Sequence, residues 1–204
     1  MTSALYFTAV QADPGWQAVL ESFTRFLALP PTQRVLDVGC GPGQLPRLLT
    51  AAGHSVTGLD HDPAMVVQAA AHATGSTYLV GDLLTLPFAP ATFDAVLATN
   101  VVFLTADPAR ALREMARLVR PGGTVAMLNP SEAMSIATAT ALADDRNLTG
   151  FSRTSLINWG RIAEANHRFT PADITALYQQ AGLPNPTTAD KLGHGLARFV
   201  KARK

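Results

Sequence analysis

The stretch RVLDVGCGPGQLPRLL, from Arg34 to Leu49, places three glycines and a proline between two apolar runs. The first run, RVLDV, is short and rich in Val and Leu, which is typical of a buried strand. The second run, QLPRLLTAAG, has helical spacing and ends at Gly53, a residue type that commonly caps helices at the C-terminus. The segment therefore predicts a strand, a glycine turn and a helix in that order.

The rest of the chain continues this alternation of strands and helices. Several helices open with Asp-Pro or Thr-Pro, which joins an N-cap residue to proline at the first helical position. The tail has room for one or two strands, including GLARFVKA at 195–202. The pattern predicts a three-layer, doubly wound α/β fold with a mostly parallel, Rossmann-like sheet. Further strands are expected at 55–60, 77–82, 93–100 and 124–130, and helices at 13–29, 62–75, 107–123 and 170–182.

One segment interrupts the alternation. Residues 131–168 follow Pro130 and mix Ala, Ser and Thr with large apolar residues such as Phe151 and Trp159. The segment is too apolar for a solvated linker and too polar for a buried core element. We expect a largely helical lid that binds the acceptor, inserted in a single domain spanning residues 1–204. A static helical buttress away from the site is the alternative.

Composition narrows the classes of function. The chain has 204 residues, of which 48% are hydrophobic and 15% charged, and its net charge is +1. Such a chain is expected to bury a substantial core. Without a long basic run, neither nucleic acid nor a membrane is favoured as a partner. Because the start does not resemble a signal peptide and no apolar run approaches a membrane span, a cytoplasmic location is expected.

Three carboxylates follow successive strands. Asp37 lies in the glycine turn, Asp60 ends the second strand, and Asp82 follows the third. Ligands of doubly wound sheets bind beyond the carboxyl ends of the strands, and a carboxylate after the second strand can accept ribose hydroxyls. As a strand-end carboxylate, Asp60 is expected outside the core. The set suits a ligand with a ribose, an amine and a positive charge.

The glycine spacing argues against a pyrophosphate ligand. It is G-x-G-x-G, and Gln44 stands where the dinucleotide fingerprint has its third glycine. A P-loop is excluded because no Gly-Lys-Ser/Thr follows. A nucleotide-dependent oxidoreductase and a nucleoside-binding protein that transfers nothing both remain open at this point.

Taken together, the motifs resemble those of class I S-adenosylmethionine-dependent methyltransferases, in particular the small single-domain type. VLDVGCGPG is similar to the first motif, GLDHDPAM to the ribose-binding segment and GDLLTLPF to the adenine-binding segment. FDAVLATNVVFLTADP and REMARLVRPGGTVAM resemble the fourth motif and the unit that follows it, and FTPADITALYQQAGL is a further match. The resemblance implies methyl transfer from S-adenosylmethionine by direct displacement. Transfer of a different group from the same donor is an alternative, which analysis of the products would distinguish from methyl transfer.

The resemblance also implies which residues bind the methionine end of S-adenosylmethionine. Gly39, Cys40, Gly41 and Gly43 would line it with backbone contacts, and Asp37 would orient its amino group. Cys40 is the only cysteine, so an internal disulfide and a multi-cysteine metal site are excluded, and we expect no metal. A small buried residue is the expected state of Cys40.

For the adenosine end, the resemblance implies that Asp60 holds the ribose, with His61 beside the adenine. Asp82 would accept a hydrogen bond from the adenine amine, and Leu83 would pack on the ring.

The end of the fourth strand would lie between the donor and the acceptor. Thr99 and Asn100 would approach the amino-acid moiety of the donor, but Phe103-Leu104 stands where many relatives carry a His pair. His167 is the candidate catalytic residue facing the acceptor, and a surface histidine is the alternative. An NPPY signature is absent where ATNV stands, which favours a small-molecule acceptor. The acceptor atom and a homodimer are left open.

Overall fold

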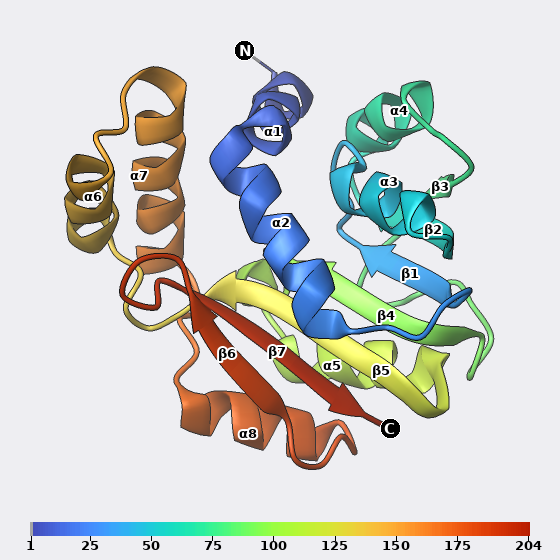
Figure 1. Ribbon diagram of the computed structural model, residues 1–204. Helices are drawn as coiled ribbons and strands as arrows, with labels where there is room; N and C mark the ends of the chain where they lie inside the picture. The colour runs from blue at the N-terminus through green and yellow to red at the C-terminus, as the bar shows by residue number, and fades with distance from the viewer. Residues whose placement is uncertain (1) are drawn as a thin grey trace.

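The computed structural model describes residues 2–204, which build one seven-stranded sheet in the order β3-β2-β1-β4-β5-β7-β6 (Figure 1). Strands β1 to β5 pair in parallel, whereas β7 is antiparallel to both β5 and β6. This confirms the doubly wound, mostly parallel sheet. The strands are β1 Arg34–Val38, β2 Ser55–Asp60, β3 Thr77–Val80, β4 Phe93–Thr99, β5 Val119–Pro130, β6 Thr187–Lys191 and β7 Ala197–Arg203.

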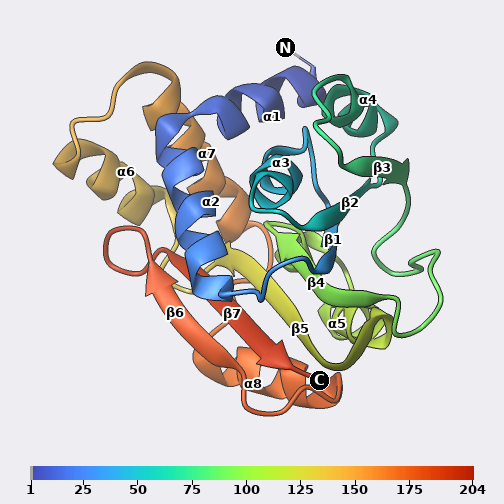
Figure 2. The same cartoon turned by 45° about the vertical axis from the view of Figure 1, so that its right-hand side comes forward.

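Helices cover both faces of the sheet (Figures 1 and 2). Leu20 and Phe23 of α2 and Leu45 of α3 pack on one face, and α5 and α8 cover the other. No helix within residues 2–204 is both long and apolar enough to cross a membrane. The helices are α1 Ser3–Ala12, α2 Pro14–Leu27, α3 Gln44–Ala51, α4 Pro63–Ala71, α5 Pro108–Leu118, α6 Ile136–Asp145, α7 Gly150–Glu164 and α8 Pro171–Gln180, with a 3₁₀ turn η1 at Val102–Leu104.

The alternation of side chains along β1 places the first carboxylate. Val35 faces the α2–α3 side, while Leu36 and Val38 face the α5–α8 side, and all three are buried. Because strand side chains alternate, Asp37 lies on the same face as Val35. Asp37 is a residue of β1, not of the glycine turn as expected, because its backbone pairs with Gly58 of β2.

Two boundaries differ from the expectations. Helix α5 ends at Leu118, before the expected Pro121-Gly122-Gly123 stop, because β5 already begins at Val119. Val119 pairs with Phe93 of β4, and Lys204 exchanges backbone hydrogen bonds with Gly122 (2.8 Å) and Gly123 (3.0 Å). Helix α1 was not expected at all, although the Thr2 side chain caps it by accepting from Leu5 N–H.

Residues 131–168 form the helical pair α6 and α7, as expected for a largely helical insertion. The pair is close-packed, since a Cβ on Gly160 would lie 2.5 Å from the Ser135 carbonyl oxygen. Helix α7 also docks on α2, where the Trp16 and Trp159 rings meet edge to face at 5.7 Å.

We expect Trp159→Ala to lower the free energy of unfolding by about 2–3 kcal/mol, because truncating a large packed side chain leaves a cavity. Urea denaturation of the ligand-free protein measures it. Val67→Ala, at a side chain that is 65% exposed on α4, is the matched control and should change stability little. A Trp159→Ala variant as stable as the control would mean that α7 does not rest on α2 in solution.

Candidate active site

Residues 39–43, between β1 and α3, form a tight loop that we call the glycine loop. Gly39 and Cys40 both donate their N–H to the Leu59 carbonyl, at 2.7 and 3.0 Å. Gly39 has a φ of 70°, and a Cβ there would lie 2.1 Å from Cγ2 of Val101. A side chain is therefore excluded at Gly39 by both backbone conformation and space.

Asp60 anchors this loop to the end of β2. One carboxylate oxygen accepts the Gly41 N–H at 2.8 Å, and the other accepts the Asp62 N–H at 3.0 Å. Asp60 is only 6% exposed, so the expectation that it lies outside the core is wrong. It is buried because its carboxylate accepts hydrogen bonds from two backbone N–H groups. The side chain of His61 is exposed, with Nδ1 3.4 Å from Asp60. Each carboxylate oxygen keeps a lone pair for a further donor.

Asp37 is fully buried, and neither of its carboxylate oxygens has a hydrogen-bond partner among residues 2–204. Burial, followed by the negative charge of Asp60, raises the pKa of Asp37 well above the ordinary value of an aspartate. An ionised carboxylate in this position is costly unless a cation or hydrogen-bond donor partners it. A positively charged ligand group beside Asp37 would therefore stabilise its ionised form.

Cys40 is buried, as expected, with 2% of its surface exposed. Burial and the charges of Asp37 and Asp60 raise the pKa of its thiol. The side chain therefore stays protonated, which removes it as a nucleophile or base.

The remaining predicted residues lie along the same edge of the sheet. Asp82 follows β3, is exposed, and accepts the Leu84 N–H at 2.8 Å, while Leu83 is buried. Thr99 ends β4. Asn100 has a φ of 57° and donates its N–H to the Leu128 carbonyl at 2.7 Å. The carboxamide oxygen of Asn100 is buried without a partner among the described residues, so it can accept from a ligand.

His167 precedes α8 and is exposed. Its ring stacks on Phe169 at 5.6 Å, and its backbone N–H donates to the carbonyl of Phe103 in η1 at 3.2 Å. Within residues 2–204 no group of three or more His, Cys, Asp and Glu side chains is placed to hold a metal.

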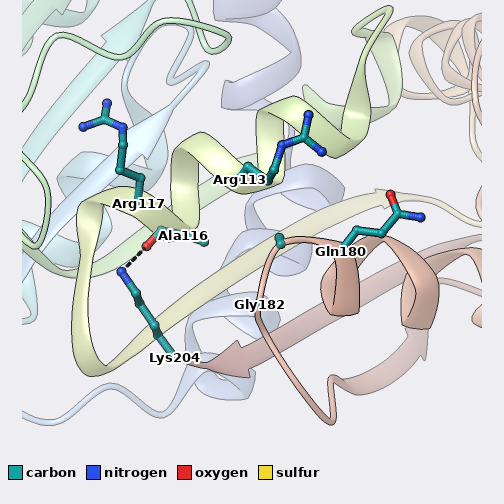
Figure 3. Close-up of a pocket in the computed structure, with 7 residues that line it drawn as sticks. Arg113, Ala116, Arg117, Gln180, Gly182 and Lys204 are labelled. Carbon is teal, nitrogen blue, oxygen red and sulfur yellow. Dashed lines mark hydrogen bonds between the residues drawn. The ribbon is translucent and has the colours of Figure 1, made fainter.

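A shallow hollow lies at the opposite edge of the sheet, between α5 and α8 (Figure 3). Two of the three cations that line it, Lys204 and Arg117, already bind groups of the protein. Lys204 Nζ donates to the Ala116 carbonyl at 2.8 Å, and Arg117 pairs with Glu114 at 2.8 Å. We therefore do not assign a ligand to this hollow.

Sequence reasoning missed Gln11 of α1. Its Nε2 donates to the Cys40 carbonyl at 3.3 Å, and its Oε1 accepts the Gln44 N–H at 2.9 Å. These partners are 29 and 33 residues away, so no local pattern could reveal them.

Comparison with known proteins identifies the family. Residues 36–127 match the family model for a methyltransferase domain. Over 200 aligned residues the chain is 33% identical to 2-phytyl-1,4-naphtoquinone methyltransferase of Thermosynechococcus vestitus, covering 88% of this chain and 84% of that protein. The chain belongs to the class I S-adenosylmethionine-dependent methyltransferases.

A second curated relative of this methyltransferase aligns over less of its length. Malonyl-[acyl-carrier protein] O-methyltransferase of Erwinia billingiae is 44% identical over 93 residues, covering 46% of this chain and 37% of that protein. The chain thus spans little more than a third of the length of the first curated relatives.

The solved structures that resemble this methyltransferase have low sequence identity to it, so they inform only on its fold. An S-adenosylmethionine-dependent methyltransferase from Mesorhizobium loti superimposes with a TM-score of 0.66 at 21% identity, covering 95% of this chain and 99% of that one. Phosphoethanolamine N-methyltransferase 2 of Haemonchus contortus, in complex with S-adenosyl-L-methionine, gives a TM-score of 0.70 at 16% identity and covers 94% and 53% of the two chains.

Proposed function

We propose that this protein transfers a methyl group from S-adenosylmethionine, the donor, to a small-molecule acceptor. The observation that carries the proposal is Asp37, a buried carboxylate without a partner beside the glycine loop. The donor carries an ammonium and a sulfonium, which are the charges that such a carboxylate requires. The donor also carries a ribose, whose hydroxyls suit the lone pairs left on Asp60. When bound, the donor supplies a methyl group already activated for displacement.

The chain contributes mainly by positioning. Asp37 would orient the amino group, the glycine loop would line the methionine portion, and Asp60 would hold the ribose. Asp82 and Leu83 would bind the adenine. Fixing two reactants in a productive geometry can lower the barrier by up to about 7–11 kcal/mol in ideal systems. Cys40 stays protonated and provides no base, so any proton released by the acceptor would pass to water or to a residue of the α6–α7 segment.

The acceptor would bind beside the end of β4, under the α6–α7 pair acting as a cover. At this end of β4, Thr99 and the unpartnered carboxamide oxygen of Asn100 would contact the amino-acid moiety of the donor. The relative that aligns over most of its length is named for 2-phytyl-1,4-naphtoquinone, which makes naphthoquinones the first acceptors to screen.

We expect the purified protein to bind S-adenosylmethionine and S-adenosylhomocysteine but not NAD. Titration calorimetry with the three ligands measures this. Formation of S-adenosylhomocysteine in a screen of acceptors then separates a methyltransferase from a protein that only binds nucleosides. Tight NAD binding without a response to either sulfur compound would contradict the proposal.

A further inference from the structure

Gln11 supplies a missing helix cap. Helix α3 begins at Gln44, and its N-cap residue, Gly43, has no side chain to accept a hydrogen bond. The first N–H groups of a helix have no partner within the helix, so they need one from outside. Gln11 provides it, because its Oε1 accepts the Gln44 N–H at 2.9 Å. The cap of α3 therefore comes from α1.

The same carboxamide also contacts the glycine loop itself. Gln11 Nε2 donates to the Cys40 carbonyl, which already accepts the Gly43 N–H at 3.0 Å. Nε2 lies directly over Gly41, since a Cβ there would be 3.1 Å from it. One side chain thus contacts the loop in its middle and at its exit.

Helix α1 is joined in turn to α7. Asn158 Nδ2 donates to the Tyr6 hydroxyl at 2.9 Å, and the Tyr6 ring meets Phe151 edge to face at 5.9 Å. Ser152 donates to the carboxylate of Asp13, at the junction of α1 and α2. Figure 2 shows α1 in dark blue crossing the top of the molecule from α7 towards α4, above α3. Tyr6 and Gln11 therefore connect α7 to the glycine loop through a single helix.

We propose that Gln11 is a positioning residue that holds the glycine loop in its donor-binding shape and couples that shape to the docking of α1 on α7. This inference rests on the proposed function, because it concerns the donor site of that reaction. Without Gln11, the Gln44 N–H and the Cys40 carbonyl would lose the contact that fixes the glycine loop. Part of the free energy of donor binding would then be used to order the loop, and donor affinity would fall. Loss of the hydrogen bond between the Tyr6 hydroxyl and Asn158 would weaken donor binding through the same helix.

The first test uses Gln11→Met, which keeps the length of the side chain and removes both hydrogen bonds. We expect the dissociation constant of S-adenosylhomocysteine to rise about five- to thirty-fold, the range for one or two lost hydrogen bonds. The melting temperature should fall by about 2–4 °C, because the N-cap of α3 is lost. The matched control is Thr8→Val on the same helix, because the Thr8 hydroxyl contacts only the Ala4 carbonyl of α1. Equal affinities for the Gln11→Met and Thr8→Val variants would overturn the proposal.

The second test is a double-mutant cycle between Gln11→Met and Tyr6→Phe, which removes the hydroxyl that binds Asn158. If α1 transmits the effect, Tyr6→Phe weakens S-adenosylhomocysteine binding in the parent but has little further effect once Gln11 is replaced. A merely structural role at either site gives additive losses. Additive losses would therefore overturn the coupling.

Amide hydrogen exchange provides a readout that needs no ligand. Exchange of the Gln44 amide should be at least about ten-fold faster in Gln11→Met than in the parent, with α5 amides unchanged. An unchanged Gln44 rate would show that the hydrogen bond is absent in solution and would contradict the inference. A parent protein that binds no S-adenosylhomocysteine contradicts the proposed function instead, and the exchange data distinguish the two failures.

Discussion

Asp37→Asn is expected to weaken donor binding by about ten- to a hundred-fold while making the ligand-free protein more stable. The loss follows from removing a charge-assisted hydrogen bond to the donor ammonium, which is usually worth about 1.5–3 kcal/mol. The gain follows because a fully buried, unpartnered carboxyl group, which costs free energy at neutral pH whether it ionises or takes up a proton, is removed. A substitution that only disrupted the fold would lower both stability and binding, so the two opposite effects together identify Asp37 as a ligand-binding residue.

The stability gain has a defined pH dependence. The pKa of Asp37 is raised in the folded protein, so between its unfolded value of about 3.9 and the raised value the folded state binds the extra proton. Stability of the parent therefore falls as pH rises through this window. Asp37→Asn lacks this fall, so the two proteins should differ above the window and converge below about pH 4.

Asp94→Asn is the control with the opposite sign. Asp94 accepts the Arg34 N–H at 2.7 Å and pairs with Arg120, at the edge of the sheet away from the glycine loop. The pKa of Asp94 is lowered, first by the Arg34 N–H, so its contribution to stability is present at neutral pH and is lost as pH falls through the lowered pKa. Asp94→Asn should thus reduce stability at pH 7 and leave donor affinity unchanged.

Thermal unfolding from pH 4 to 8 and titration calorimetry with S-adenosylhomocysteine measure both effects. For a chain of this size, each kcal/mol shifts the melting temperature by about 2–4 °C. Donor affinity of the parent should also rise with pH, because binding favours the ionised form of Asp37. An Asp37→Asn variant that binds the donor like the parent would remove Asp37 from the site.

Much of the fold could be predicted because its signals are local. The Val- and Leu-rich run that became β1, and the Asp-Pro and Thr-Pro starts of α2, α4, α5 and α8, depend on neighbouring residues. The extension of β5 back to Val119 could not be predicted, because Val119 pairs with Phe93 of β4, and Gly122 and Gly123 bond to Lys204 at the other end of the chain. Helix α1 was missed for a related reason, since its partners lie on α7 and in the glycine loop.

The candidate site divides in the same way. The strand-end positions of Asp37 and Asp60 follow from the alternation of strands and helices. Their burial and hydrogen bonds do not, because these depend on how the loops after β1 and β2 fold against each other. The sequence suggests that the carboxylate of Asp60 is free to bind a ribose, whereas in the structure it already accepts hydrogen bonds from two backbone N–H groups.

This difference changes the expected effect of Asp60→Ala. Removing the carboxylate deprives the Gly41 and Asp62 N–H groups of their acceptor, so the loss concerns the glycine loop as well as the ribose. We expect donor binding to weaken by about a hundred-fold or more, the sum of a lost charge-assisted hydrogen bond and a disordered loop. We also expect the free energy of unfolding to fall by about 1–3 kcal/mol, the usual cost of leaving a buried donor unsatisfied.

Asp62→Ala separates the two causes. Asp62 is the N-cap of α4, and its side chain accepts the Ala64 N–H at 2.9 Å. Its removal should cost about 1 kcal/mol of stability, as for other N-caps, while leaving the glycine loop and donor affinity intact. Calorimetry and urea denaturation of both variants make the comparison. If Asp60→Ala loses no more donor affinity than Asp62→Ala, then neither the ribose contact nor the loop anchor is made by Asp60. A large loss of affinity without a loss of stability would assign Asp60 to the ribose alone, because the glycine loop would then keep its shape without the carboxylate.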